Sequence, residues 1–330
     1  MNEPGGAFSL SAVVPAFNEA AVIERFLRAL RDTLVPLTSS FEIIVIDDGS
    51  SDDTAAIVER TSASLNLTLL KLSRNFGKEA ALTAGLAHAR GDAVLIIDAD
   101  FQDPLELVPR MVARWREGFD MVYGVRRERG EESWLRRAGT RWFYRMMAVG
   151  TRVDVPPYAQ DFRVLDRKVV DAINRLPERN RFMKGLYAWV GFKSIGIEYR
   201  HAERAGGSSS FGWRRLARLG LTGLTAFSNL PLRVWGAAGM LIALGAIGYG
   251  VVIAVRTLVF GNPVPGFTTL AVSIMFFSGV QLLSIGIIGE YLGRVYEETK
   301  ARPTFLIERV VDRSPLRSIG DARSPTEPHA

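Results

Sequence analysis

The chain has 330 residues, 48% of them apolar and 23% charged, which fits a folded domain of ordinary size with additional segments. Because cysteine is absent and histidine occurs only three times, the sequence excludes disulfides and cysteine-based zinc or thiol chemistry, and it argues against a histidine-rich metal site. The net charge of +6 is weak evidence for nucleic-acid binding, and we expect no nucleic-acid partner.

The first part of the chain alternates between strand and helix patterns. The strand patterns are almost entirely apolar, which favours a mostly parallel sheet with helices on both faces and therefore an α/β fold. No internal repeat is present. We expect strands at 9–16, 41–50, 67–73, 92–100 and 120–126, and helices at 19–34, 51–63, 77–89 and 104–118.

After Gly212 the composition changes to that of a membrane anchor. Residues 211–232 place apolar side chains near one face and arginines on the other, as in an interfacial amphipathic helix. Residues 234–255 and 267–289 carry no charge and are long enough to span a bilayer, and a short turn at 261–266 joins them. For the first of these runs, the alternative is a buried core helix.

These patterns predict a division of the chain into four parts. They are an α/β domain at 1–210, the amphipathic segment at 211–232, a two-helix transmembrane hairpin at 233–295 and a C-terminal tail at 296–330.

The expected location is a membrane, in which the two apolar runs are embedded. Basic residues lie mainly on the outer sides of the hairpin, so the positive-inside rule places the α/β domain and both termini in the cytoplasm. The N-terminus does not resemble a signal peptide. The tail from Arg313 onward is rich in proline, serine and charge, and we expect it to be disordered. Glycines in the apolar runs permit close helix packing, which is compatible with a homo-oligomer.

The acids in "IIDADFQDP" (96–104) directly follow a buried strand pattern. Asp98 and Asp100 are two residues apart, so in an extended chain their side chains converge beyond the carboxyl end of the strand, where open α/β sheets bind ligands. Two carboxylates so close repel each other unless a cation lies between them, and oxygen ligands favour magnesium or manganese. Asp103 has a simpler explanation as a helix N-cap, with Pro104 at the first helical position.

Polar residues also follow the first two strands. Asp47 and Asp48 end the second strand, and Pro15 and Glu19 lie at the end of the first strand or in the loop after it. The dinucleotide fingerprint and the P-loop motif are both absent, which argues against a dinucleotide oxidoreductase and a P-loop ATPase. A sheet edge rich in carboxylates can still bind a nucleotide. A carboxylate accepts hydrogen bonds from a base or a ribose, and a metal ion binds the diphosphate.

Six motifs follow one another along the chain: "VVPAFNEA", "IDDGSSDDT", "LSRNFGKEAAL", "DADFQDP", "VYGVRRERGEESWLRR" and "DFRVLDRKVV". In this order they resemble the motifs of glycosyltransferase family 2. They resemble the polyprenyl-phosphate glycosyltransferase branch of that family, over roughly residues 10–305. The two apolar runs are similar to the two-helix anchors of its bacterial members. The resemblance implies a GT-A fold, an inverting mechanism, a location in the bacterial inner membrane and a cytoplasmic active site.

The resemblance implies a donor site with a divalent cation, Mg²⁺ or Mn²⁺. Asp48 would meet the base and ribose together with Ile46, and Lys78 would approach the diphosphate. For Asp48 the alternative is a turn residue before Gly49, and for Lys78 it is a solvated lysine at a helix start. The implied donor-binding residues are Pro15, Phe17, Glu19, Ile46, Asp48, Lys78, Asp98, Ala99 and Asp100, and the implied metal ligands are Asp98, Asp100 and Gln102.

The acceptor implied by the resemblance is a lipid phosphate. Arg126, Arg136 and Thr140 match the family positions that hold its phosphate, for which arginine offers paired hydrogen bonds. Asp161 matches the position of the proposed base. Because a phosphate monoester is already anionic near neutral pH, we expect Asp161 to orient the acceptor or the sugar more than to remove a proton. The structural alternative is an ion pair between Asp161 and Arg163.

The sequence departs from the family after the last core strand. The family often has R-x-x-G-x-S-[KN]-Y there, whereas in this chain Arg204, Gly207 and Ser209 are followed by a serine and a phenylalanine. The residue that would reach the diphosphate is therefore a serine. Either Arg204 and Lys78 neutralise the charge of the diphosphate, or donor binding depends more on the metal. The glycine- and serine-rich run is typical of a loop that closes over a donor.

The expected reaction is the transfer of a hexose from a nucleotide-sugar to a polyprenyl phosphate, with Asp161 and Asp100 as catalytic residues. UDP-glucose is the favoured donor and GDP-mannose the alternative. A processive polysaccharide synthase is disfavoured, because the Q-x-x-R-W motif and additional spans are absent. The alternative from another class is a non-catalytic membrane-bound adaptor that binds nucleotide, against which the acids and Lys78 argue.

Overall fold

The computed structural model of the chain describes residues 8–126, 159–199 and 266–316, apart from 66, 180 and 315, together with isolated positions between 239 and 259. The chain divides into two compact units. The first comprises residues 1–144, 153–212 and 303–330, and the second comprises residues 145–152 and 213–302.

The first unit is built on an eight-stranded sheet with the strand order β7-β5-β6-β4-β1-β2-β3-β8. Strand β6 is antiparallel to β4 and β5, and β8 is antiparallel to β3, while the remaining neighbours are parallel. The expected α/β fold with a mostly parallel sheet is thus confirmed. The strands are β1 (Ser9–Ala16), β2 (Ser40–Asp47), β3 (Leu67–Leu72), β4 (Ala93–Ile96), β5 (Met121–Arg126), β6 (Ala159–Asp166), β7 (Ser194–Tyr199) and β8 (Ile307–Asp312).

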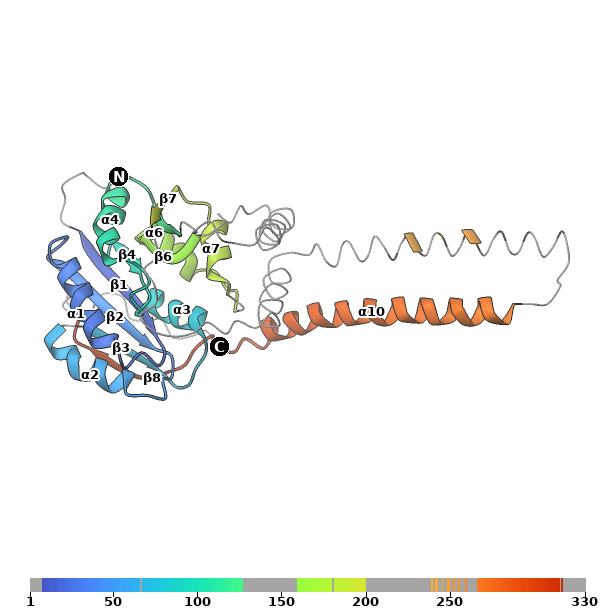
Figure 1. Ribbon diagram of the computed structural model, residues 1–330, viewed down its shortest axis with the longest axis horizontal. Coiled ribbons are helices and arrows are strands. Elements are labelled where there is room, and N and C mark those ends of the chain that lie inside the picture. The colour runs from blue at the N-terminus through green and yellow to red at the C-terminus, as the bar shows by residue number, and fades with distance from the viewer. Residues whose placement is uncertain are drawn as a thin grey trace. The chain divides into compact units, whose positions relative to one another are not determined.

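Helices cover both faces of the sheet (Figure 1). Helices α1, α2 and α4 share one hydrophobic core with Leu10, Ala12 and Val14 of β1, and α3 packs on the opposite face against β1, β2 and β3. Gly85 of α3 is needed there, because a Cβ at this position would collide with the side chains of Val13 and Ile46. The helices are α1 (Ile23–Leu34), α2 (Thr54–Leu65), α3 (Lys78–His88), the 3₁₀ helix η1 (Leu105–Leu107), α4 (Val108–Arg116), α6 (Arg167–Asn174) and α7 (Met183–Trp189).

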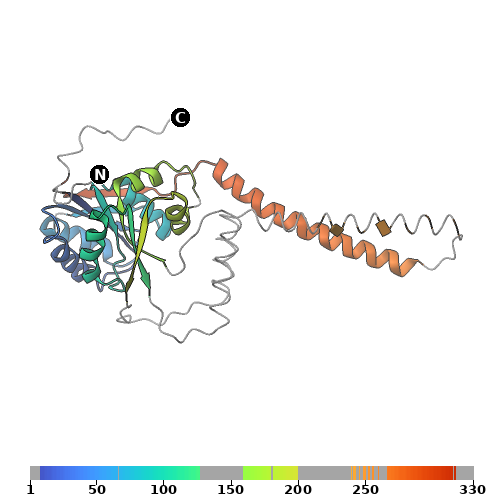
Figure 2. The ribbon, with the colours of Figure 1, turned by 90° about the horizontal axis from the view of Figure 1, so that it is seen from above.

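The C-terminal segment contributes the edge strand β8, which pairs with β3 (Figure 2). Beyond it, the Ser314 hydroxyl donates to the buried carboxylate of Glu42 at 2.8 Å, and Leu316 is buried. The expectation of disorder from Arg313 onward is therefore wrong for these residues. The physical reason is that the unpaired edge of β3 and the buried Glu42 both need partners, and the C-terminal segment supplies them.

The second unit contains the long helix α10 (Phe267–Thr299). Its 33 residues correspond to a length of about 50 Å. Within the described residues, α10 is the one helix long and apolar enough to cross a membrane, over the stretch Phe276–Gly293, and none of that stretch is buried inside the protein. The expected first span at 234–255 and the amphipathic segment at 211–232 lie largely outside the described residues, so the two-helix hairpin stays a prediction.

Candidate active site

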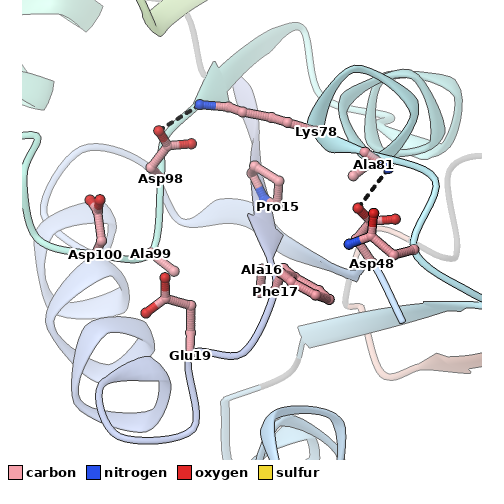
Figure 3. A pocket seen from close by; sticks show the side chains of 12 residues that line it. Pro15, Ala16, Phe17, Glu19, Asp48, Lys78, Ala81, Asp98, Ala99 and Asp100 are labelled. Carbon is pink, nitrogen blue, oxygen red and sulfur yellow. Dashed lines mark hydrogen bonds and ion pairs between the residues drawn. The ribbon is translucent and has the colours of Figure 1, made fainter. Parts of the chain in front are cut away.

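A pocket of about 280 Å³ lies at the carboxyl ends of β1, β2 and β4 (Figure 3). The chain runs from β1 outward to β2 on one side, whereas β4 lies on the other side of β1. Such a reversal of strand order is where open α/β sheets bind ligands. The pocket is lined by Pro15, Ala16, Phe17, Glu19, Asp48, Asn75, Gly77, Lys78, Ala81, Asp98, Ala99 and Asp100.

The loop after β1 is fastened to the loop after β2 by hydrogen bonds. Asn18 has a left-handed backbone with φ of 57°, and its Oδ1 accepts from the backbone N–H of Ser51 at 2.9 Å. The backbone N–H of Glu19 donates to the Thr54 hydroxyl at 2.8 Å. These contacts hold Glu19 and the half-exposed ring of Phe17 at the pocket.

Asp48 joins the end of β2 to the segment that precedes α3. Its carboxylate accepts the backbone N–H groups of Phe76 at 2.8 Å and Gly77 at 2.9 Å. Burial raises the pKa of Asp48, and these two hydrogen bonds oppose that effect. Asp48 is therefore more than a turn residue before Gly49, because it fixes the loop at the pocket wall.

The loop after β4 presents two carboxylates to the pocket. Asp100 Oδ1 accepts the backbone N–H of Gln102 at 3.0 Å, and the Gln102 amide donates to Asp100 Oδ2. Between them, Phe101 has an unusual φ of 58°. Its ring packs edge-on against Phe26 at 5.2 Å between centroids, so burial of an aromatic ring holds the left-handed turn.

This loop supplies oxygen donors for a hard cation. Asp98 and Asp100 line the pocket, and a half-turn of the Gln102 amide would replace its Nε2 by Oε1 on the side of Asp100. Among the described residues, no three acids or histidines are grouped closely enough to bind a metal by themselves. The residues fit a cation whose coordination is completed by an amide and by substrate oxygens.

Asp103 has a different role from the one expected. Its carboxylate accepts the Tyr199 hydroxyl at 2.7 Å, and it is buried. Helix η1 has Pro104 as its N-cap residue and no side-chain cap bond. The N-cap interpretation is wrong because β7 brings a buried hydroxyl that needs an acceptor. Burial also raises the pKa of Asp103 to about 6.

Lys78 lies between two carboxylates from different strands. Its ammonium is 2.6 Å from Asp98 Oδ2 and 3.1 Å from Asp161 Oδ2. In the antiparallel pairing of β4 with β6, Ile96 is opposite Arg163, and continuing this register by two residues brings Asp98 opposite Asp161. Like charges in that position repel each other, and the ammonium relieves the repulsion. Lys78 is therefore ion-paired at the pocket, although 41% of its side chain is exposed.

The same contacts determine the ionisation of Lys78 and Asp161. Burial alone would lower the pKa of Lys78, but the carboxylates of Asp161 and Asp98 outweigh it and raise the pKa. Burial alone would raise the pKa of Asp161, but the cations of Lys78, Lys184 and Arg163 outweigh it and lower the pKa. Asp161 is thus a carboxylate at neutral pH and a weak base.

The alternative of an ion pair between Arg163 and Asp161 is not found in the described part of the chain. Its guanidinium lies 3.7 Å from the ring centroid of Tyr187, and it donates to the backbone carbonyl of Gln160 at 2.5 Å. Arg163 is almost fully buried, and it acts on Asp161 through its charge.

Glu79 is a buried acid beside the pocket that the sequence analysis missed. Its carboxylate accepts the backbone N–H of Met183, the first residue of α7, at 2.9 Å. Burial raises the pKa of Glu79 from 4.5 to about 7, and the charge of Asp161 adds to the shift. The signal available in the sequence was its position next to Lys78 in "GKEAAL", but the contact with α7 spans 104 residues.

Glu79 is expected to make the stability of the protein depend on pH. Between pH 4.5 and about 7 the folded state binds more protons at Glu79 than the unfolded state does, so the free energy of unfolding falls as pH rises through this window. Glu79→Gln keeps an acceptor for Met183 and removes this contribution. The melting temperature of the variant minus that of the wild type should be larger at the upper end of this pH window than at the lower end. An identical pH dependence in both proteins would contradict this assignment.

The remaining predicted site residues fall into two groups. Ile46 is fully buried, and its side chain points toward Gly85 beneath α3, so the structure does not bring it to the pocket. The side chain of Arg126 and the residues Arg136, Thr140 and Arg204 lie outside the described part of the chain, and their roles stay predictions.

Comparison with known proteins finds a matching family model and relatives that align over most of the chain. Residues 11–173 match the model of "Glycosyl transferase family 2". An uncharacterized glycosyltransferase of Synechocystis sp. is 44% identical over 90% of this chain and 94% of its own length. The bactoprenol glucosyl transferase of Shigella phage SfX is 44% identical over 91% of this chain and 98% of its own length.

A solved structure also resembles the chain at lower similarity. It is a mannosyltransferase from Pyrobaculum calidifontis in complex with GDP-Man and Mn²⁺, with 17% identity and a TM-score of 0.45 over 91% of this chain and 89% of that one.

Proposed function

The chain belongs to glycosyl transferase family 2 and is a glycosyltransferase, and on this basis we propose that it transfers a hexose from a nucleotide-sugar to a polyprenyl phosphate, with UDP-glucose as the donor. The observation that carries the proposal is the 44% identity, over nearly the whole of both chains, to a protein named bactoprenol glucosyl transferase. The position of the pocket at the carboxyl ends of β1, β2 and β4 supports it.

The donor binds in the pocket with its nucleoside toward β1 and β2. The exposed ring of Phe17 offers an apolar face to the base, and Glu19 and Asp48 offer carboxylates to base N–H groups or ribose hydroxyls. The diphosphate lies at the N-terminus of α3, where the helix dipole and the ammonium of Lys78 both favour negative charge.

Asp98, Asp100 and Gln102 hold a divalent cation, either Mg²⁺ or Mn²⁺. When bound, the cation neutralises charge on the departing nucleoside diphosphate. The half-turn of the Gln102 amide lets the loop after β4 present an oxygen instead of the Nε2 that now donates to Asp100.

The reaction is a displacement with inversion. An oxygen of the lipid phosphate forms a bond to the anomeric carbon while the bond from that carbon to the diphosphate breaks, which gives a polyprenyl-phosphate sugar and a nucleoside diphosphate. Arg126, Arg136 and Thr140 bind the acceptor phosphate, and Arg204 adds charge at the donor. Asp161 orients the acceptor or the sugar, because its lowered pKa leaves it a weak base.

The protein is anchored in the inner membrane through α10 and the apolar run that precedes it. The exposed apolar side chains of α10 support this part of the proposal. The catalytic unit and both termini lie in the cytoplasm, where nucleotide-sugars are present and a lipid phosphate is accessible at the membrane surface.

The choice of donor is tested by thermal stabilisation of the full-length protein in detergent. With Mn²⁺ present, UDP and UDP-glucose are expected to raise the melting temperature more than GDP and GDP-mannose do. Larger stabilisation by GDP and GDP-mannose would identify GDP-mannose, and not UDP-glucose, as the donor. If none of the four compounds stabilises the protein, the pocket is not a donor site. Release of UDP that requires a polyprenyl phosphate separates an enzyme from a nucleotide-binding adaptor.

A further inference from the structure

The ammonium of Lys78 occupies a position between the proposed cation site and the proposed acceptor site. Lys78 comes from the first turn of α3, Asp98 from the loop after β4 and Asp161 from β6. The three groups form a continuous chain, with distances of 2.6 Å and 3.1 Å from the ammonium to the two carboxylates. Figure 3 shows the Lys78 side chain extending across the top of the pocket to Asp98.

This arrangement creates a conflict at Asp98. A divalent cation needs an oxygen of Asp98, but one of these oxygens is already bound to an ammonium. A cation entering beside Lys78 would also meet a positive charge at short range, and charges at such distances interact strongly where water is partly excluded. Both effects weaken the binding of a cation that arrives alone.

We propose that Lys78 is an exchangeable counter-ion that keeps the cation site closed until the donor diphosphate draws its ammonium away from Asp98. This inference rests on the proposed function, because it takes Asp98 as a cation ligand and Lys78 as a diphosphate contact. It adds that donor and cation bind cooperatively, since the diphosphate removes the competitor of the cation.

The exposure of the three side chains fits an exchange on the side of Asp98. Lys78 is 41% exposed and Asp98 is 34% exposed, whereas Asp161 is 18% exposed. The ammonium is therefore accessible to a phosphate in the pocket, and lysine reorients on a flexible stem. Asp161 has other cations near it in Lys184 and Arg163, so it does not lose all compensation when Lys78 moves.

The alternative is a fixed structural bridge between α3 and the two strands. A fixed bridge predicts that neutralising Lys78 lowers stability without opening a cation site. An exchangeable counter-ion predicts that the same change makes the site bind a cation more tightly without any substrate. Cation binding to the free protein separates the two.

The test is the affinity of the full-length protein in detergent for Mn²⁺ without nucleotide, measured from the electron paramagnetic resonance signal of free Mn²⁺. Lys78→Met and Lys78→Gln are both expected to bind Mn²⁺ about tenfold more tightly than the wild type, because a nearby positive charge is lost. Lys78→Arg keeps the charge and should stay close to the wild type. Lys168→Met is the matched control, because Lys168 pairs with Asp120 instead.

Two results would overturn the proposal. One is unchanged or weaker Mn²⁺ binding by whichever neutral variant retains the wild-type melting temperature. The other is a gain in affinity that persists in Lys78→Met combined with Asp98→Asn, because the cation would then lie elsewhere. Both results concern binding alone. Failure of the wild type to transfer glucose would instead refute the proposed function, and the two failures are thereby distinguishable.

Discussion

Asp98→Asn is expected to lower kcat/KM for sugar transfer by about a thousandfold, because it removes a charged cation ligand whose effect is greatest when the diphosphate leaves. The fold should persist, since Asp98 lies in a loop at the pocket and Lys78 keeps Asp161 as a partner. Steady-state rates with saturating Mn²⁺ and the melting temperature of the same preparation provide the measurement.

Asp92→Asn is the matched control for this change. Asp92 precedes β4 at the end opposite the pocket, where it accepts hydrogen bonds from the backbone and the hydroxyl of Ser9 at 2.8 and 2.7 Å. Its replacement should leave kcat/KM within about twofold of the wild type. Retention of more than about a tenth of the activity by Asp98→Asn would show that this carboxylate is not a ligand in the reaction.

Asp161→Asn is expected to lower kcat/KM for the lipid acceptor by about a hundredfold while donor binding changes little, because an orienting group is lost and the donor contacts remain. The lowered pKa of Asp161 means that it is ionised across the neutral range. The pH–rate profile of the variant should therefore keep the shape of the wild-type profile between about pH 6 and pH 9.

Two outcomes separate the roles that Asp161 could have. Loss of an inflection of the wild-type profile in the variant would identify Asp161 as a general base and contradict the orienting role. Near-normal turnover with intact donor binding would remove any part for it in the reaction. Asp171→Asn is a suitable control, because Asp171 is a partly exposed residue of α6 that pairs with Arg167 at 3.7 Å.

Local sequence patterns were sufficient to predict the strands and helices of the first 126 residues. The boundaries differ where the loops determine them. Helix α1 begins at Ile23 rather than at residue 19, because Asn18 turns the chain and binds the loop after β2. Strand β4 ends at Ile96, where the loop that carries Asp98 and Asp100 begins.

The polar residues at the strand ends predicted the pocket correctly, since parallel strands bring their carboxyl ends to one edge. The interactions among those residues were not predictable in the same way. Nothing in the local pattern indicates that Lys78 bridges Asp98 and Asp161, or that Asp103 accepts from Tyr199, which lies 96 residues later. These contacts depend on the pairing of strands distant in the chain.

Strand β8 and Ile46 illustrate two further limits. Thr68 of β3 binds Asp312 of β8 across 244 residues, and no local pattern in "IERVVD" identifies its partner strand. Ile46 was assigned to the donor site by resemblance alone. The alternation of side chains along β2 instead directs it toward α3, on the same face as Val13.

The most direct test is transfer of labelled glucose from UDP-glucose to undecaprenyl phosphate by the purified full-length protein with Mg²⁺ or Mn²⁺. We predict that one UDP is released for each labelled glucose recovered on the lipid phosphate, and that the α-linked donor gives a β linkage in the product. UDP release without lipid-linked glucose, or lipid-linked sugar formed only from GDP-mannose, would contradict this prediction.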